Sequence, residues 1–203
     1  MTLFRSKAEQ KVLEKGYERD RLPPGQYLTE KWPVLHAGTV PKVDLATWAF
    51  RVFGEVEHPL VLSWQELLEL PAHELTTDIH CVTRWSRFDT RFKGVRWATL
   101  AELVKPMPSA SFVVAHAEQE YTANLPLSAL EDDDVLIAYE ADGEALAPEH
   151  GWPLRLVVPS RYFWKSAKWL RGLELTPHDR PGFWERYGYH NDADPFREER
   201  YAF

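Results

Sequence analysis

A single cysteine stands among charged residues near the middle of the chain. It lies in the run Asp78-Ile79-His80-Cys81-Val82-Thr83-Arg84-Trp85-Ser86. Because a disulfide needs two cysteines, Cys81 cannot form one within the chain. Cationic neighbours lower the pKa of a thiol toward the thiolate, which is the nucleophile and the metal ligand. Arg84 therefore favours a functional thiol, whereas the common alternative is a buried, inert cysteine. The spacing alone leaves both interpretations open.

Two basic stretches stand out, although the protein is acidic overall with a net charge of −7. The first carries Arg84, Arg87, Arg91, Lys93 and Arg96. The second carries Arg155, Arg161, Lys165, Lys168 and Arg171. Each stretch alone is equally well read as an exposed strand or loop. Two of them in an acidic protein indicate a shared anionic ligand, while the overall charge argues against nucleic acid or a membrane as partner.

The second basic stretch also has the pattern of a phosphate site. His150 and Arg155 flank the entrance of a predicted strand at 154–158, and Lys168 stands just before the next strand at 169–175. Arginine and lysine near the backbone N–H groups of a turn suit a phosphate. The alternative is a strand that carries an exposed arginine.

Common signatures of other sites are absent from the sequence. There is no phosphate-binding glycine loop, no dinucleotide fingerprint, no His-Glu-x-x-His, no Cys-x-x-Cys and no Gly-x-Ser-x-Gly. Eight histidines and Cys81 could still form a metal site from distant positions. His80 and Cys81 are a poor zinc pair, because neighbours on a strand point to opposite faces.

The elements that must position these residues are short. Capping-box patterns predict four helix starts, at Ser6-x-x-Glu9, Ser63-x-x-Glu66, Thr99-x-x-Glu102 and Ser128-x-x-Glu131. Apolar, β-branched and aromatic runs predict strands at 47–53, 75–82, 111–117, 135–140, 154–158 and 169–175. Asp142-Gly143 predicts a tight turn after one of them. Strands and long helices do not alternate, so we predict an α+β domain with a mixed or antiparallel sheet.

Length and composition predict one domain, since 203 residues contain no Ser/Gly-rich linker. We divide it into an N-terminal helix and arm (1–30), a central domain (31–176) and a C-terminal extended segment packed on it (177–203). The N-terminus turns charged at once without an apolar stretch, and one cysteine suits a reducing compartment. We therefore expect a cytoplasmic monomer that has no membrane partner.

Three segments together resemble the sulfite oxidase family of molybdopterin enzymes. They are Cys81-Val82-Thr83-Arg84-Trp85-Ser86, His150-Gly151-Trp152-Pro153-Leu154-Arg155 and Lys165-Ser166-Ala167-Lys168-Trp169. The sequence is more similar to the small branch typified by the catalytic subunit of bacterial protein-methionine-sulfoxide reductase. The arm Pro33-Val34-Leu35-His36-Ala37-Gly38 also resembles that family's first cofactor-contacting segment.

This resemblance implies a single mixed-sheet domain of the molybdopterin-binding type and an oxidoreductase that transfers an oxygen atom or performs a related two-electron step. It implies a molybdenum ion held by the Cys81 thiolate and by the dithiolene of one molybdopterin, which agrees with the softness of thiolate ligands. Arg84 is expected beside the substrate. The pterin and its phosphate are assigned to His36, His116, His150, Arg155, Ser166, Ala167 and Lys168.

Two departures bear on the substrate. Sulfite-oxidising members of the family carry arginines where this chain has Leu35 and Ser86. An oxyanion loses charge-assisted contacts without them, so we expect that sulfite is not the preferred small-molecule substrate. Electrons are expected to pass through a redox partner protein. The alternative is a non-enzymatic binding module that uses its nine Trp, eight Tyr and ten Phe as a contact surface.

Overall fold

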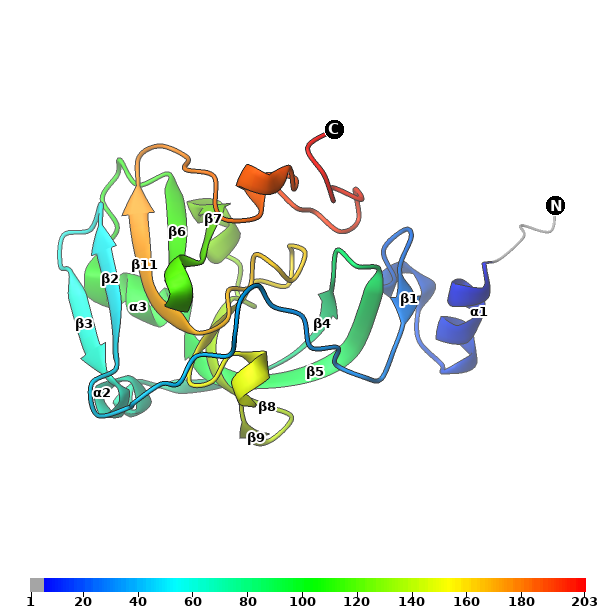
Figure 1. The fold of residues 1–203 in the computed structure, drawn as a ribbon, viewed down its shortest axis with the longest axis horizontal. Helices are drawn as coiled ribbons and strands as arrows, with labels where there is room; N and C mark the ends of the chain where they lie inside the picture. The colour runs from blue at the N-terminus through cyan, green and yellow to red at the C-terminus, as the bar shows by residue number, and fades with distance from the viewer. Residues whose placement is uncertain (1–5) are drawn as a thin grey trace.

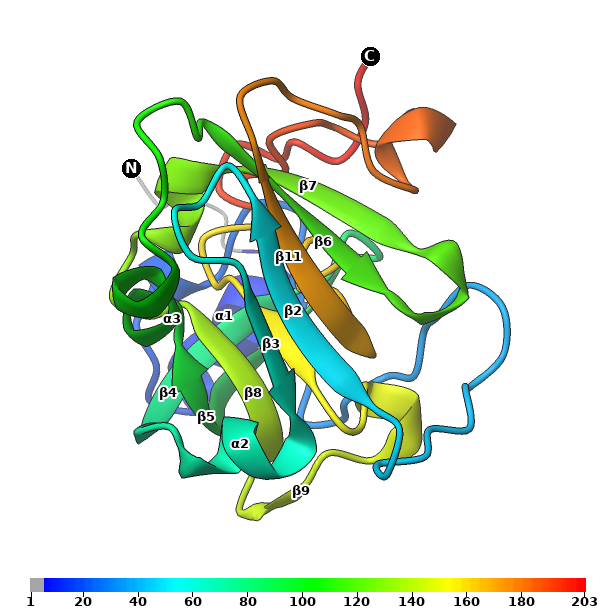
Figure 2. The same cartoon turned by 90° about the vertical axis from the view of Figure 1, so that its left-hand side faces the viewer.

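Two mixed β-sheets form the body of the protein (Figures 1 and 2). The computed structural model describes residues 6–203, so the first five residues of the predicted segment 1–30 lie outside the described residues. The strands are β1 (Tyr27–Leu28), β2 (Ala49–Gly54), β3 (Leu60–Ser63), β4 (Ala72–His80), β5 (Trp85–Arg96), β6 (Phe112–Ala117), β7 (Thr122–Pro126), β8 (Leu136–Ala141), β9 (Glu144–Ala145), β10 (Arg155–Val157) and β11 (Leu170–Thr176).

The helices between these strands are short. Within residues 6–203 the α-helices are α1 (Lys7–Glu14), α2 (Trp64–Glu69) and α3 (Trp97–Val104). Single 3₁₀ turns are η1 (Arg19–Arg21), η2 (Glu118–Glu120), η3 (Leu127–Leu130), η4 (Pro148–His150) and η5 (Glu185–Tyr187). None of the helices in the described part of the chain has the length and apolarity to cross a membrane.

The first sheet is organised around the long strand β5. One edge of β5 pairs antiparallel with β4, and its other edge pairs with β1 at its start and with β8 at its end. β8 in turn pairs with β10 and with β9, which follows the predicted Asp142-Gly143 turn. The second sheet has the order β3-β2-β11-β6-β7, in which only β11 and β2 run parallel. The predicted α+β fold with mixed sheets and short helices is therefore confirmed.

Two of the four helix starts predicted from capping signals are correct. Ser6 and Ser63 each cap their helix through a reciprocal capping box. The predicted start at Thr99 is wrong, because α3 begins at Trp97 after an Arg96 that makes no side-chain cap. Trp97, Leu100 and Val104 lie on one buried face, and their packing outweighs a missing cap. The predicted start at Ser128 gives only the 3₁₀ turn η3.

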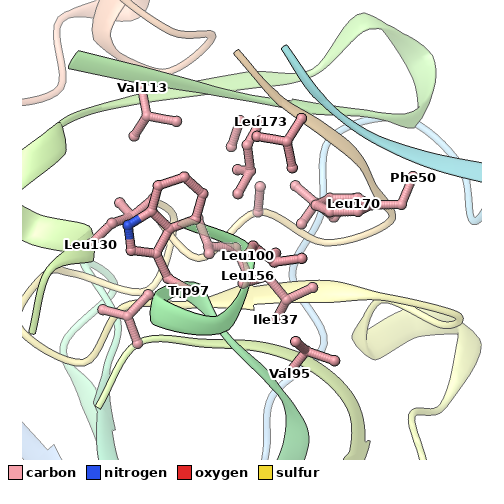
Figure 3. Packing of buried hydrophobic residues seen from close by; sticks show 14 of the residues in the cluster. Phe50, Val95, Trp97, Leu100, Val113, Leu130, Ile137, Leu156, Leu170 and Leu173 are labelled. Atoms are coloured by element: carbon pink, nitrogen blue, oxygen red, sulfur yellow. The ribbon is translucent and has the colours of Figure 1, made fainter. Parts of the chain in front are cut away.

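The main core lies between the second sheet, α3 and the inner ends of β8 and β10 (Figure 3). Fully buried side chains from these elements meet there, including Phe50, Val113, Ile137 and Leu173. A second cluster lies under β4 and β5 and contains Cys81. Cys81 therefore packs in the second cluster, beside β4 and β5, and not in the main core.

The N-terminal arm and the C-terminal segment meet near the β4–β5 hairpin, where Arg200 contacts Pro24 and Val82. In Figure 1 the orange-to-red C-terminal segment runs from the side of β7 toward β4 and β5, and the blue N-terminal region lies at β1. The C-terminal segment is anchored by a buried ion pair between Lys165 and Glu185 at 2.7 Å. Asn124 of β7 adds a hydrogen bond from Nδ2 to Asp179 Oδ1 at 2.7 Å. These contacts place residues 183–189 against the loop that precedes β11.

Candidate active site

Cys81 lies at the tip of the β4–β5 hairpin, in a loop of four residues, 81–84. The Arg84 N–H donates to the Cys81 carbonyl at 3.0 Å, and the Cys81 N–H donates to the Trp85 carbonyl at 2.9 Å. Strand β4 ends at His80, one position before the cysteine, although the sequence predicted a strand through Val82. Because the loop turns there, Cys81 faces a cavity, although only 8% of it is exposed.

The environment of the thiol differs from the sequence-based expectation. Burial raises the pKa of Cys81, and a hydrogen bond with Thr83, at 3.1 Å between Sγ and Oγ1, offsets this only in part. The expected lowering by Arg84 is wrong. Arg84 has a φ of 77°, is exposed, and does not line the cavity. Its guanidinium lies beside Gly25, so the structure does not place Arg84 at a reacting centre.

The cavity has a volume of about 470 Å³, and its walls come from distant parts of the chain. They are the arm at 32–38, the cysteine loop, the segment at 118–121, Arg155 of β10, the loop at 163–169 and the C-terminal segment at 183–189. Aromatic side chains dominate these walls, namely Trp32, Trp85, Tyr121, Phe163, Trp164, Trp169, Phe183, Trp184 and Tyr189. A largely apolar pocket with few polar groups is typical of a cofactor or small-molecule site.

Arg155 on β10 brings a positive charge into this apolar cavity. Its side chain is 1% exposed and donates to the carbonyls of His150 at 2.8 Å and Ser166 at 3.0 Å. Its guanidinium also lies over the ring of Phe163. The Nε atom has no hydrogen-bond partner. Burial lowers the pKa of this guanidinium below its usual range, so the fold keeps a cation where a charge is costly.

Lys168 supplies a second cation beside Arg155. Its ammonium donates to the Glu149 carbonyl at 2.7 Å. Burial and the neighbouring charge of Arg155 lower the pKa of Lys168 to about 7. Within residues 6–203 neither cation forms an ion pair with a carboxylate. A buried arginine and a half-buried lysine without a counter-charge are the arrangement expected of a site that binds an anion.

Glycine at position 151 allows these two cations to come together. It ends η4 with a φ of +113°, a conformation that favours glycine. A Cβ there would lie 3.1 Å from Lys168 Cβ and 3.2 Å from Arg155 Cβ. The His-Gly-x-Pro-x-Arg pattern therefore has a steric reason as well as a chemical one.

Of the remaining predicted site residues, three line the cavity and two do not. His36, Ser166 and Ala167 line the cavity. His150 stands behind it and stacks on Trp32 at a centroid distance of 4.2 Å.

Burial and the charges of Arg155 and Lys168 lower the pKa of His150 to about 4, so this ring is neutral at pH 7. His36 lies at the exposed rim, and its Nδ1 is 3.2 Å from the Gly38 carbonyl. Ser166 is buried, and its Oγ accepts a hydrogen bond from the Val158 N–H at 3.0 Å.

His116 is outside the cavity, which corrects its assignment as a cofactor contact. Its Nε2 is paired with Glu174 Oε2 at 2.8 Å across the β6–β11 ladder. Ala115, its neighbour in β6, is fully buried toward the core. Because side chains alternate along a strand, His116 points to the opposite face of the sheet.

Sequence reasoning missed the C-terminal contribution to the cavity. Phe183, Trp184 and Tyr189 line it, and the Tyr189 ring packs against Trp184 and Trp164 at centroid distances of 4.9 and 5.2 Å. The high aromatic content of residues 177–203 was the available signal. It indicated an ordered segment but not which surface the segment covers.

The donor set at the cavity suits a soft metal bound through an anionic cofactor. One thiol stands on its wall, and a cation pair with an unpartnered nitrogen stands on another. Thiolate sulfur is the protein donor that soft metals select. Nowhere in residues 6–203 do three or more His, Cys, Asp or Glu side chains gather as ligands of a metal ion.

Comparison with known proteins identifies the family. The model of the oxidoreductase molybdopterin binding domain matches residues 37–184. The chain is 48% identical over 183 residues to the uncharacterized oxidoreductase YuiH of Bacillus subtilis, covering 90% of this chain and 92% of that protein. It is 29% identical over 176 residues to the protein-methionine-sulfoxide reductase catalytic subunit MsrP of Campylobacter jejuni, covering 73% of this chain and 57% of that protein.

A solved structure agrees with these sequence matches. The sulfane dehydrogenase SoxCD from Paracoccus pantotrophus superposes with a TM-score of 0.65 at 25% identity, covering 75% of this chain and 43% of that chain. The chain thus spans nearly all of YuiH but about half of MsrP and of the SoxCD chain.

The mixed-sheet fold and a cavity with one thiol and an uncompensated cation pair define a cofactor-dependent enzyme. The chain belongs to the oxidoreductase molybdopterin-binding domain family and is a molybdopterin-dependent oxidoreductase of the sulfite oxidase type, on the branch similar to MsrP. The Mo cofactor follows from this membership. The prediction of an enzyme is therefore confirmed, and the alternative of a non-enzymatic binding module is set aside.

Proposed function

We propose that Cys81 is the protein ligand of the molybdenum and that Arg155 and Lys168 hold the phosphate of the pterin. The observation that supports this most strongly is that one cavity is lined by the single thiol and by Arg155 and Lys168, which form no ion pair with a carboxylate within residues 6–203. When bound, the cofactor supplies the two-electron redox chemistry, and the protein supplies position and electrostatics.

The other cavity residues complete this proposal. Ser166, Ala167 and His36 lie where they can contact the pterin, and His150 fixes the Trp32 ring that covers it. The C-terminal aromatic wall excludes water from the side of Cys81. Burial raises the pKa of Tyr189, so its hydroxyl stays protonated at neutral pH and can donate a hydrogen bond to an acceptor oxygen.

We propose a neutral substrate, such as a sulfoxide or an N-oxide, rather than sulfite. Leu35 lines the cavity at a position where sulfite-oxidising relatives carry an arginine. Ser86, the other departure, is fully buried against His80 and lies outside the cavity. The substrate argument therefore depends on Leu35. An anion entering this aromatic space would lose solvation that no free cation replaces.

Elemental analysis tests the cofactor proposal first. The full-length protein, produced in a host that makes the Mo cofactor, is expected to contain molybdenum near one ion per chain. Cys81→Ser is expected to fold but to lose turnover. Wild-type protein without molybdenum, or Cys81→Ser with unchanged turnover, would contradict the proposal.

Steady-state kinetics test the substrate proposal. The turnover of sulfite, of small sulfoxides and of N-oxides is measured and compared. Artificial electron donors or acceptors supply or remove the electrons in these assays. We expect sulfoxide or N-oxide turnover to exceed sulfite turnover in the wild type. In Leu35→Arg we expect sulfite turnover to rise relative to turnover of the neutral substrates. Dominant sulfite turnover by the wild type would overturn the preference.

We further propose a setting for this enzyme. Electrons reach it through a redox partner protein, and the single cysteine is compatible with the reducing cytoplasm. The protein acts as a monomer with an N-terminal helix and arm (1–30) and an oxidoreductase domain (31–176), on which the C-terminal segment (177–203) packs. Cell fractionation and light scattering test the location and the oligomeric state.

A further inference from the structure

Two side chains from opposite ends of the chain donate hydrogen bonds to the backbone of the cysteine loop. Gln26 Nε2 donates to the Cys81 carbonyl at 3.0 Å. Arg200 Nη1 donates to the carbonyl of Val82, the next residue, at 2.7 Å. Both donors lie outside the 37–184 range that matches the family model.

Both donors are buried and fixed in place. Gln26 is 4% exposed and Arg200 is 6% exposed. Arg200 Nη2 donates to the Pro24 carbonyl at 3.2 Å, and its guanidinium lies over the Tyr162 ring at 4.9 Å. Arg200 therefore ties the C-terminal segment, the N-terminal arm and the cysteine loop together.

The N-terminal arm and the C-terminal segment pack closely at Gly25. Gly25 has a φ of +69°, and a Cβ there would lie 3.2 Å from Arg200 Nη2 and closer still to the Glu198 carboxylate. The backbone of Tyr27 continues the contact, since its N–H donates to the Arg84 carbonyl at 2.8 Å. The arm thus runs along the whole cysteine loop from Gly25 to β1.

We infer that Gln26 and Arg200 are positioning residues that clamp the cysteine loop and hold the Cys81 thiol toward the cavity. Neither lines the cavity, so they act through the backbone and do not touch a reacting group. The functional meaning of the clamp depends on the proposed function, in which Cys81 binds the metal. Groups that orient a metal ligand tune its affinity and the electronic state of the metal.

The clamp makes a prediction that requires no cofactor. Cys81 is the only cysteine in the chain, so the rate of maleimide labelling, corrected for the thiolate fraction by its pH dependence in each variant, reports the accessibility of this one thiol. In full-length, cofactor-free protein, Arg200→Met removes a charge-assisted hydrogen bond, and we expect labelling to become about tenfold faster. Gln26→Met should give a smaller acceleration. Arg200→Lys keeps a donor and should label at a rate between the wild type and Arg200→Met.

Two controls separate positioning from general stability. Arg197→Met changes an arginine of the same segment whose side chain is 72% exposed, and it should label at the wild-type rate. Val113→Ala creates a cavity in the distant core and lowers overall stability without touching the loop. The labelling rates are compared between variants whose free energy of unfolding, measured in urea, is lowered by the same amount. If Arg200→Met and Gln26→Met then label no faster than Val113→Ala, the inference is wrong.

The loaded enzyme gives a second readout. The electron paramagnetic resonance spectrum of Mo(V) should shift in Gln26→Met and Arg200→Lys but not in Arg197→Met. A wild-type protein without molybdenum contradicts the proposed function, whereas the labelling rates still decide the clamp. A loaded wild type with unchanged labelling and unchanged spectra in the variants contradicts the clamp alone.

Discussion

The two basic stretches carry similar positive charge, but their basic side chains have different surroundings in the fold. In the first stretch, on and around β5, Arg87 pairs with Asp142 at 2.6 Å and Lys93 with Glu140 at 3.4 Å. In the second, Lys165 pairs with Glu185. Arg155, which is buried, and Lys168, which is half-buried, donate hydrogen bonds only to carbonyls. The first stretch thus stabilises a sheet and its hairpin.

Both stretches contain cations that form no ion pair with a carboxylate within residues 6–203. Those of the second stretch, Arg155 and Lys168, line the cavity, whereas those of the first, Arg84, Arg91 and Arg96, do not. The difference teaches that a run of basic residues indicates a ligand only when burial and missing carboxylates accompany it. Both properties depend on the fold. The following predictions test whether this contrast corresponds to cofactor binding.

The largest effect is expected from Arg155→Met compared with Arg87→Met. Loss of charge-assisted hydrogen bonds to the phosphate should lower cofactor affinity by about ten- to a hundredfold. Arg87→Met should retain the cofactor. Molybdenum content after dialysis measures this, with circular dichroism to check folding. Full retention by Arg155→Met, or equal loss by Arg87→Met, would break the comparison.

Gly151→Ala should destabilise the protein and weaken cofactor binding together. The added Cβ meets both Arg155 and Lys168 and forces a φ of +113° on alanine, at a cost of about 1–3 kcal/mol. Gly143→Ala is the matched control, because it also has a positive φ but nothing within 4 Å of the added Cβ. Urea unfolding and molybdenum content should show both losses for Gly151→Ala and only a stability loss for Gly143→Ala.

The pH dependence of stability should report Lys168 in the cofactor-free protein. Its pKa is about 7 in the folded state and 10.5 as the ordinary value. Between these values the unfolded chain binds the extra proton, so the free energy of unfolding should rise with pH from about 7 to 10. Lys168→Met should show a smaller rise than the wild type in urea titrations. Parallel pH profiles would argue against the lowered pKa.

The smallest effect is expected from Asp142→Asn, which breaks an ion pair of the first stretch. Arg87 and Asp142 have side-chain exposures of 19% and 38%, and such pairs contribute about 1 kcal/mol or less. Asparagine also tolerates the positive φ of this turn. Urea unfolding should show a small loss and molybdenum analysis none. A large loss of cofactor would mean that the first stretch also contacts the ligand.

The sequence predicted the parts of this structure that depend on local signals. The capping boxes at Ser6 and Ser63 and the Asp142-Gly143 turn depend on residues a few positions apart, and the structure confirms them. The long strand β5 was missed because its charged residues do not read as a buried run. The shared cavity of Cys81, Arg155 and Lys168 followed from the family resemblance.

The remaining features depend on contacts between distant residues. The partner of Arg87 is 55 positions away, so no local pattern could separate a paired from an unpaired arginine. The sequence predicted the strand that carries His116. It did not show that the side chain of His116 lies on a face of the sheet away from the cavity. The contribution of Tyr189 and the clamp by Arg200 required the path of the C-terminal segment, which lacks periodicity.

X-ray absorption at the molybdenum edge tests the central claim most directly, because it counts the sulfur atoms bound to the metal. The wild-type enzyme should show one sulfur neighbour more than Cys81→Ser. Thr83→Val, which removes only the hydroxyl beside the thiol, should match the wild type. Equal sulfur coordination in the wild type and Cys81→Ser would contradict the assignment of Cys81 as the protein ligand.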